Sequence, residues 1–316
     1  MPLLKHVLEV LDVVDSPGAS GKAVRELFAR VGSAEVAVER VRGDKGQTDF
    51  VKLIIPGEQG KSAGGNAPTL GIIGRLGGLG ARPEQIGYVS DGDGAAAALA
   101  AALKLSEMRA RGDVLAGDVI VATHVCPDAP TQPHDPVPFM GSPVDTATMN
   151  AREVDPAMDG IFSIDTTKGN RLVNHQGIAL SAPVKEGWIL RLGDELLDLY
   201  QIVTGRYPVI LPINMQDITP YGNGVHHLNS IMQPAVATRA PVVGVAITTE
   251  AMVPGSATGA SHETDIALAA RFVVEAAKVF GRGRLAFYDQ AEYQRLVQLY
   301  GSMKPLQQRH SSSAGE

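Results

Sequence analysis

The chain has 316 residues, and its 28 lysines and arginines against 34 aspartates and glutamates give a formal net charge of -6. Because contact with a phosphate backbone requires a cationic surface, this balance excludes a strongly basic nucleic-acid-binding protein. Hydrophobic residues make up 44% of the chain and charged residues 20%, a composition typical of folded globular proteins rather than disordered ones.

The cysteine content and the N-terminus indicate the cellular location. A single thiol, Cys126, allows no intrachain disulfide, which argues against a disulfide-stabilised secreted protein. The first residues do not form a basic region followed by an apolar stretch, and no apolar run is long enough to span a bilayer. We therefore expect a cytoplasmic protein without a membrane or nucleic-acid partner, and we leave a homo-oligomer open.

The first part of the chain alternates between helical and strand patterns. Apolar residues at helical spacing predict a helix over residues 3–14, and Ser20 is suited to cap a second helix over 22–31. The later elements are strands over 36–41, 50–55 and 70–74, an alanine-rich helix over 95–111 and a strand over 118–125.

The rest of the chain continues this alternation after a proline-rich loop. Six prolines between residues 127 and 143 exclude regular structure and indicate a functional loop or a lid. The predicted strands cover 160–164, the surroundings of Ile189, 208–214 and 242–248, and the predicted helices cover 194–204, 225–237 and 266–280. We expect one domain over residues 1–304 and a flexible tail over 305–316.

The alternation predicts an α/β fold of three layers, α/β/α, in which a mostly parallel mixed sheet lies between helices. In open sheets of this kind the chemistry lies at the carboxyl ends of the strands. The polar residues that follow predicted strands are Arg75, Asp91, Asp93, His124, Cys126, Asp128, Asp165, Asn214, Gln216 and His262.

Three aspartates are candidate metal ligands. Asp91 and Asp93 lie where a loop becomes a helix, so each could bind a metal or cap the helix. Asp165 directly follows a predicted buried strand, where a carboxylate is costly unless it is paired or bound to a metal. A solvated turn is the alternative for Asp165, and we favour a functional role.

The histidines and the cysteine are weaker candidates. His262, just before the last long helix, could bind zinc or be an ordinary residue of a helix N-terminus. His226 and His227 would point in different directions on a helix, so they are not expected to share one metal. His134 fits a lid less well than a solvated turn, and Cys126 fits a nucleophile less well than a buried, inert thiol.

The order and spacing of these residues resemble those of the co-catalytic zinc aminopeptidases, most closely the tetrahedral, glutamyl aminopeptidase-like branch. The Asp-Ser-Pro-Gly-Ala-Ser-Gly segment at 15–21 looks like the loop between the first two helices of that family. The Asp-Gly-Asp-Gly segment at 91–94 is similar to its metal-bridging aspartate junction. Asp165 matches a third carboxylate ligand and His262 the last histidine ligand. The resemblance runs from about residue 3 to residue 280, and the chain looks like a member of a bacterial family related to these enzymes.

The chain also departs from the pattern of those aminopeptidases. Arg75 and Gly77 stand where the histidine and aspartate of the first metal motif belong, and the strand over 118–125 lacks the expected glutamate pair. The large insert domain of such enzymes is absent. The resemblance therefore implies one bound divalent ion rather than two, zinc in first place with manganese or cobalt as alternatives.

The first functional hypothesis is a metal-dependent hydrolase of an amide or peptide-like C–N bond in a small substrate. The metal ligands would be Asp91 or Asp93, Asp165 and His262, and the last two are expected to lie roughly 3–5 Å apart. A water molecule would lose its proton to Asp128 or His124.

Substrate binding has its own candidates. Arg75 would bind a substrate carboxylate, unless it forms an ion pair with Asp91 or Asp93. His226 and Glu263 are further candidates for contacts with the substrate. The alternative hypothesis is a non-catalytic relative that binds a small amino-acid-like or peptide ligand in the same cleft.

Overall fold

A mixed β-sheet forms the middle layer of the protein. The computed structural model describes residues 3–75, 87–133, 138–213, 228–252, 257 and 259–307. Within these residues the main sheet has ten strands; eight follow the order β1-β2-β4-β3-β7-β12-β8-β11, and β9 and β10 form a hairpin that joins β12. The strands of the sheet are β1 (Glu35–Gly43), β2 (Gly46–Ile55), β3 (Leu70–Gly74), β4 (Val119–Val125), β7 (Gly160–Thr166), β8 (Gly177–Ser181), β9 (Val184–Lys185), β10 (Trp188–Ile189), β11 (Ile210–Leu211) and β12 (Val242–Thr248).

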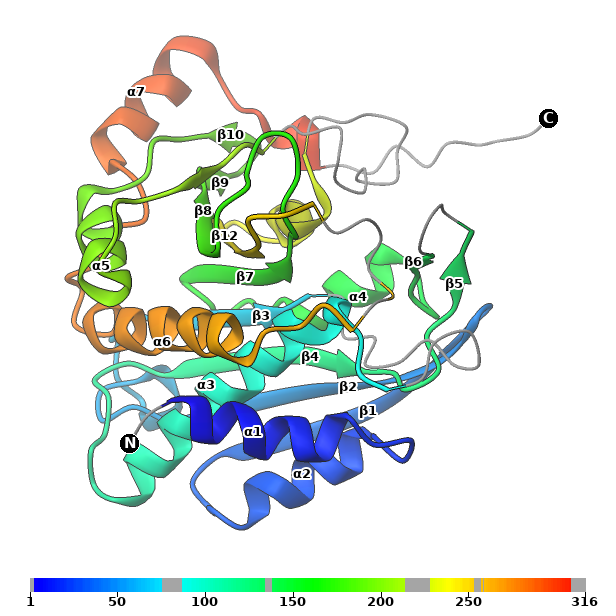
Figure 1. Ribbon diagram of the computed structural model, residues 1–316. Coiled ribbons are helices and arrows are strands. Elements are labelled where there is room, and N and C mark those ends of the chain that lie inside the picture. Colours follow the sequence, from blue (N-terminus) through cyan, green and yellow to red (C-terminus); the bar gives the residue numbers. More distant parts are fainter. Residues whose placement is uncertain are drawn as a thin grey trace.

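Helices cover both faces of this sheet. Strands β4, β3, β7 and β12 are parallel to one another and are flanked by the antiparallel strands β2 and β8. The helices are α1 (Leu3–Val14), α2 (Gly21–Ala29), α3 (Asp93–Ala110), α4 (Thr146–Glu153), α5 (Asp194–Thr204), α6 (Glu263–Phe280) and α7 (Gln290–Tyr300), with the 3-10 helices η1 (Lys61–Ala63), η2 (Ser90–Gly92), η3 (Ser230–Val236) and η4 (Lys304–Gln307). Helices α1, α3 and α6 pack side by side on one face, and α4 and η3 cover the other (Figure 1). The predicted three-layer α/β/α fold with a mostly parallel mixed sheet is confirmed.

The alternation of side chains along each strand decides which residues share a face. Ile72 and Phe162 point into the core formed with α1, α3 and α6, whereas their neighbours Ile73 and Ile161 pack in the core beside η3. Because successive side chains of a strand point to opposite faces, a residue two positions further on returns to the same face. The ends of β3, β4 and β7 therefore place three polar side chains on the face that α4 and η3 cover, namely those of Arg75, His124 and Asp165.

Several elements differ from those predicted. Helix α4, strand β8 and helix α7 have no counterpart in the sequence-based prediction. All five residues of β8 are buried, and such a short run has no periodicity that marks it as a strand. The helix predicted over 225–237 is instead, in its described part, the 3-10 helix η3, which contains Pro234. The proline-rich segment over 127–143 contains a two-stranded hairpin of β5 (Thr131–Gln132) and β6 (Phe139–Met140), while residues 134–137 lie outside the described part.

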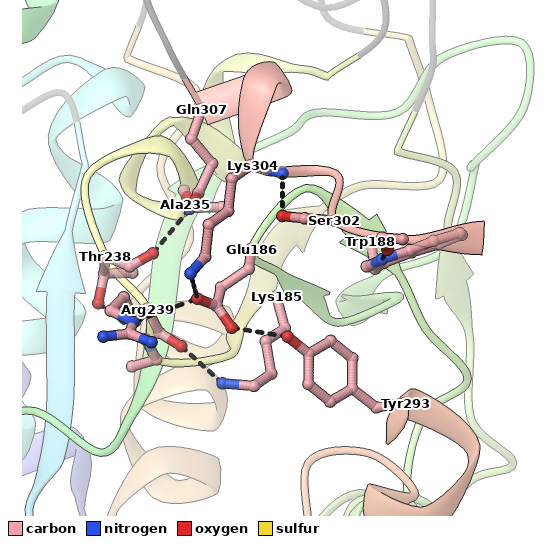
Figure 2. Close-up of polar contacts among 12 residues, drawn as sticks. Lys185, Glu186, Trp188, Ala235, Thr238, Arg239, Tyr293, Ser302, Lys304 and Gln307 are labelled. Carbon is pink, nitrogen blue, oxygen red and sulfur yellow. Dashed lines mark hydrogen bonds and ion pairs between the residues drawn. The ribbon is translucent and has the colours of Figure 1, made fainter. Parts of the chain in front are cut away.

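The C-terminal segment is anchored through Glu186 at the tip of the β9–β10 hairpin. Glu186 has a φ of 47° and Gly187 one of 85°, as a two-residue hairpin turn of type I′ requires. Its carboxylate accepts hydrogen bonds from Arg239 Nε at 3.2 Å, Lys304 Nζ at 2.9 Å and Tyr293 Oη at 2.6 Å (Figure 2).

Residues 305–307, at the start of the expected flexible tail, form part of a 3-10 helix. Helix η4 extends to Gln307, whose side-chain amide donates to the carbonyl oxygens of Ala235 and Thr238, both at 2.7 Å. These two bonds hold the segment against η3. No helix among the described residues is long and apolar enough to cross a membrane.

Substitution of Gly94 tests the close contact between α3 and the sheet. A methyl group at this position would overlap the carbonyl oxygen of Ile164 in β7. We expect Gly94→Ala to lower the free energy of unfolding by about 1–3 kcal/mol, because the helix must move away from the strand. Urea denaturation measures the change. Gly18→Ala, where the added group meets only ordinary contacts, should change stability by less than about 0.5 kcal/mol, and equal losses in both variants would contradict the prediction.

Acid should release the bonds of Glu186. Burial raises the pKa of Glu186, but its hydrogen bonds with Tyr293, Lys304 and Arg239 together outweigh burial and lower the pKa from 4.5 to about 2. A depressed carboxyl pKa contributes stability that is complete above the unfolded pKa and is lost as the pH falls from about 4.5 to about 2. We expect Glu186→Gln to lose about 1–3 kcal/mol at pH 7 and less at pH 3, as measured by denaturation at both pH values. The exposed Glu35→Gln serves as the control and should show no such pH dependence.

Candidate functional site

A buried polar cluster lies at the carboxyl ends of β3, β4 and β7. Arg75, one residue past β3, donates from Nη1 to Glu153 Oε2 and from Nη2 to Gln233 Oε1, both at 2.5 Å. The Nδ1 atom of His124 lies 2.8 Å from Glu153 Oε1. The Asp165 carboxylate is buried beside them and accepts the backbone N–H of Thr166 at 2.7 Å.

Glu153 connects the two strand residues of this cluster. It is the last residue of α4, it is fully buried, and its two carboxylate oxygens contact Arg75 and His124 separately. Arg75 is also fully buried, so its guanidinium needs this carboxylate to offset the loss of hydration. The contacts of Glu153 with Arg75 and His124 therefore fix α4 against the ends of β3 and β4.

A second group of side chains lies beside the first, at the start of α3. Asp93, the first residue of α3, accepts Lys168 Nζ at 2.9 Å and Ser261 Oγ at 2.5 Å. Asp91, in η2, is only 4% exposed and has no side-chain hydrogen bond to any described residue. Lys168 comes from the loop that follows β7, so the two groups meet at the same edge of the sheet.

Burial raises the pKa of all three aspartates. Burial is the main cause at Asp91, whose pKa is well above its usual range, and the negative charges of Asp165 and Asp93 add to it against Lys168. Burial also raises the pKa of Asp165 to about 7, although Arg75 opposes this effect. At Asp93 the effect of burial is opposed by Lys168 and Ser261. A carboxyl group with a pKa near neutrality can take up and release protons under physiological conditions.

The structure places Arg75 in this cluster but with partners that differ from those predicted. It pairs with Glu153 and Gln233 rather than with Asp91 or Asp93. The reason is geometric: α4 and η3 cover the face toward which Arg75 points. The guanidinium is fully buried, and its Nε atom has no hydrogen-bond partner among the described residues. The predicted contact with a substrate carboxylate stays a prediction.

The predicted metal ligands are not assembled as one set. In the part of the chain that the structure describes, no group of three or more His, Cys, Asp or Glu side chains is placed to hold a metal ion. His262 is the exposed N-cap residue of α6, and its predicted approach to Asp165 stays a prediction. Glu263, in the first turn of the same helix, is also exposed.

The other predicted residues are divided between buried and exposed positions. His124 lies in the cluster, whereas Asp128, the other candidate base, is exposed. Cys126 is buried, and burial raises the pKa of its thiol to about 11, as expected of an inert cysteine. His134 and His226 lie outside the described residues.

Three residues of the site were not found from the sequence. Glu153 and Gln233 lie on α4 and η3, whose positions against the sheet follow only from the tertiary structure. Lys168 stands three residues after Asp165, close behind a predicted strand end. Extending the search for polar residues a few positions past each strand would have found this lysine.

Comparison with known proteins identifies the family and supports the fold. A family model described as "Protein of unknown function (DUF1177)" matches residues 39–310, so the chain belongs to that family. No curated protein matches the chain.

Two solved structures have a similar fold. One is a mutant of tomato leucine aminopeptidase, with a TM-score of 0.50 and 13% identity; the alignment covers 86% of this chain and 61% of that one. The other is the bottromycin maturation enzyme BotP in complex with Mn, with a TM-score of 0.50 and 17% identity; here the alignment covers 88% of this chain and 70% of that one. This chain thus spans 61% of the length of the tomato enzyme. At these identities the comparison shows a shared peptidase-like fold.

Replacement of Asp165 tests the electrostatics of the cluster. Its carboxyl group has a pKa of about 7 in the folded protein and an ordinary value of 3.8, so between these values the folded state binds more protons. This group therefore makes stability fall as the pH rises from about 4 to about 7. We expect Asp165→Asn to raise the free energy of unfolding at pH 8 by about 2–4 kcal/mol and to change it little at pH 4.5.

Urea denaturation at both pH values, with EDTA present, measures this difference. The exposed Asp128→Asn is the matched control and should have no effect at either pH. A gain of the same size at pH 4.5 and pH 8 would show that Asp165 is already ionised in the folded protein.

Proposed function

We propose that this DUF1177 protein is a hydrolase that cleaves an amide or peptide-like C–N bond in a small substrate, at the carboxyl ends of β3, β4 and β7. The observation that carries the proposal is a pair of buried carboxylates, Asp91 and Asp165, to which no described lysine or arginine donates a hydrogen bond. Arg75 is paired with Glu153, and Lys168 is paired with Asp93. Two buried acidic groups in a peptidase-like fold are therefore left for protons, a cation or a substrate to neutralise.

Asp91 and Asp165 fit the first ligands of a divalent ion. Both offer carboxylate oxygens, the negative charge of Asp165 helps to raise the pKa of Asp91, and Asp91 has no side-chain hydrogen bond to any described residue. Carboxylate oxygens with water completing the coordination suit manganese or magnesium better than zinc, which prefers histidine and cysteine. BotP, which shares the fold, is described in complex with Mn. A divalent ion held here would polarise the carbonyl of the scissile bond and lower the pKa of a water molecule.

Proton transfer is assigned to His124. Its Nδ1 atom lies against Glu153, which orients the ring and leaves Nε2 to accept a proton. Arg75 acts on Glu153 and not on the substrate, so it is a positioning residue. The exposed Asp128 is the less suitable base because no described contact holds its side chain toward the cluster.

Metal titration and activity assays on the same preparations test the proposal. Isothermal titration with Mn²⁺, Mg²⁺, Co²⁺ and Zn²⁺ measures binding, and aminoacyl 4-nitroanilides and dipeptides serve as substrates. We expect Asp165→Asn to lose both metal binding and turnover, because an ion ligand is removed. His124→Gln should keep the metal while turnover falls about 10²–10⁴-fold.

Two controls separate these effects from general damage. Asp128→Asn and Cys126→Ala should leave metal binding and turnover close to those of the parent protein. If the protein binds a small amino-acid-like ligand without turning it over, and no metal changes this, the non-catalytic alternative holds. The two ion pairs already formed within the cluster, Arg75–Glu153 and Lys168–Asp93, are the observation that favours that alternative.

A further inference from the structure

A separate cavity of about 760 Å³ lies where strands β7 and β12 begin. Asp159 and Pro241, the residues just before these strands, form part of its wall. Asp165 lies six residues after Asp159, about 20 Å further along the strand at about 3.3 Å per residue, so Asp165 and Asp159 lie at opposite ends of β7. The cavity approaches the candidate functional site through α4, whose Asn150 is a wall residue one turn before Glu153. The volume is within the range of sites for small molecules.

One wall of this cavity is apolar and aromatic. Phe280, Leu285, Phe287 and Met158 line it, and Tyr288 stands at its side. Phe280 and Phe287 pack against one another with ring centroids 5.4 Å apart. Phe280 and Phe287 are almost fully buried, so the partly buried Tyr288 offers a ligand most of the aromatic surface of this wall.

The other wall carries positive charge. Lys185 and Arg239 both line the cavity and lie beside Glu186, together with Lys304 (Figure 2). Arg239 and Lys304 both pair with the carboxylate of Glu186, whereas Lys185 forms no ion pair with it. The acidic residue of the cavity, Asp159, already pairs with a lysine on η1 at 2.7 Å. The cavity therefore has an excess of positive charge.

The donors of the two cavity cations are only partly used. Lys185 Nζ donates to the carbonyl oxygen of Arg239 at 2.7 Å and lies over the rings of Tyr288 and Tyr293, 5.8 and 5.4 Å from their centroids. Arg239 donates from Nε to Glu186, and its Nη atoms have no partner among the described residues. Burial lowers the pKa of Lys185, and an anion beside it would oppose that effect.

We infer that this cavity binds a small aromatic anion, whose carboxylate or phosphate contacts Lys185 and Arg239 while its ring lies on the wall of Phe287 and Tyr288. A guanidinium with free Nη atoms suits both kinds of anion, because its planar donors match two oxygens at once. Asn150, a further wall residue, has a side-chain oxygen without a partner among the described residues and can accept a hydrogen bond from a ring substituent. This inference does not rest on the hydrolase proposed above.

Four probes distinguish the contributions of charge and ring. Isothermal titration of the full chain with benzoate and with phenyl phosphate should show binding to one site. The ligand that binds more tightly shows whether the site prefers a carboxylate or a phosphate. Benzyl alcohol, which has the ring without the charge, should not bind. Inorganic phosphate should bind more weakly than phenyl phosphate, and equal affinities would overturn the inference because the ring would then contribute nothing.

Variants locate the site. Arg239→Gln and Lys185→Met should each weaken binding of the aromatic anion at least about tenfold, since each removes a charge-assisted hydrogen bond. Arg239 is exposed, so its replacement should leave the fold intact, as circular dichroism can verify. Arg25→Gln, at an exposed arginine of α2, is the matched control and should bind as the parent does.

Two further results decide the question. Asp165→Asn should bind the aromatic anion unchanged, which separates this site from the proposed hydrolase centre. The absence of binding by either aromatic anion, or equal affinity in the parent, Arg239→Gln and Lys185→Met proteins, would rule the site out.

Discussion

The candidate site depends on the burial of one guanidinium. Arg75 is fully enclosed at the end of β3, and a charge in that position is stable only with a carboxylate against it. Glu153 supplies that carboxylate from α4, and the same group also contacts His124 at the end of β4. One acidic residue thus joins a helix to two strands. The position of α4 and the orientation of the His124 ring both depend on it.

The same arrangement accounts for the unusual state of the remaining acids. With Arg75 held by Glu153 and Lys168 held by Asp93, the fixed cations of the cluster are committed, and Asp91 and Asp165 share a buried environment. Their pKa values are raised mainly by burial, with the charges of Asp165 and Asp93 adding to the effect at Asp91 and that of Glu153 at Asp165. A site that holds two acids in this way is prepared either to exchange protons or to attract a cation, and both properties are useful for cleaving an amide bond.

The two ends of the parallel strands have opposite electrostatic characters. At the carboxyl ends, buried carboxylates predominate, whereas the cavity at the amino ends of β7 and β12 is lined by Lys185 and Arg239. Glu186 holds Arg239 in place at that end. It lies in a tight turn with a φ above zero and binds the C-terminal segment through Lys304 and Tyr293. The C-terminal segment therefore helps to position the cations that line the cavity.

Local pattern in the sequence was enough to predict the architecture. Strands β3, β7 and β12 are recognisable as short apolar runs, because helices cover both faces of the sheet and bury these strands. Helix α3 is recognisable by its alanine-rich sequence. The same rule located Arg75, His124 and Asp165, since polar residues that follow buried strands of a parallel sheet must meet at one edge.

The partners of those residues were decided by tertiary structure alone. Glu153 and Gln233 lie on short, weakly patterned elements, and only their packing against the sheet brings them to Arg75 instead of Asp91 or Asp93. His262 begins α6 as expected, yet its distance from Asp165 depends on how α6 lies across the sheet, which no local pattern encodes. Burial, charge and pKa arise from contacts between distant segments, so the sequence by itself determined which groups stand at the edge of the sheet, and the fold determined which of them interact.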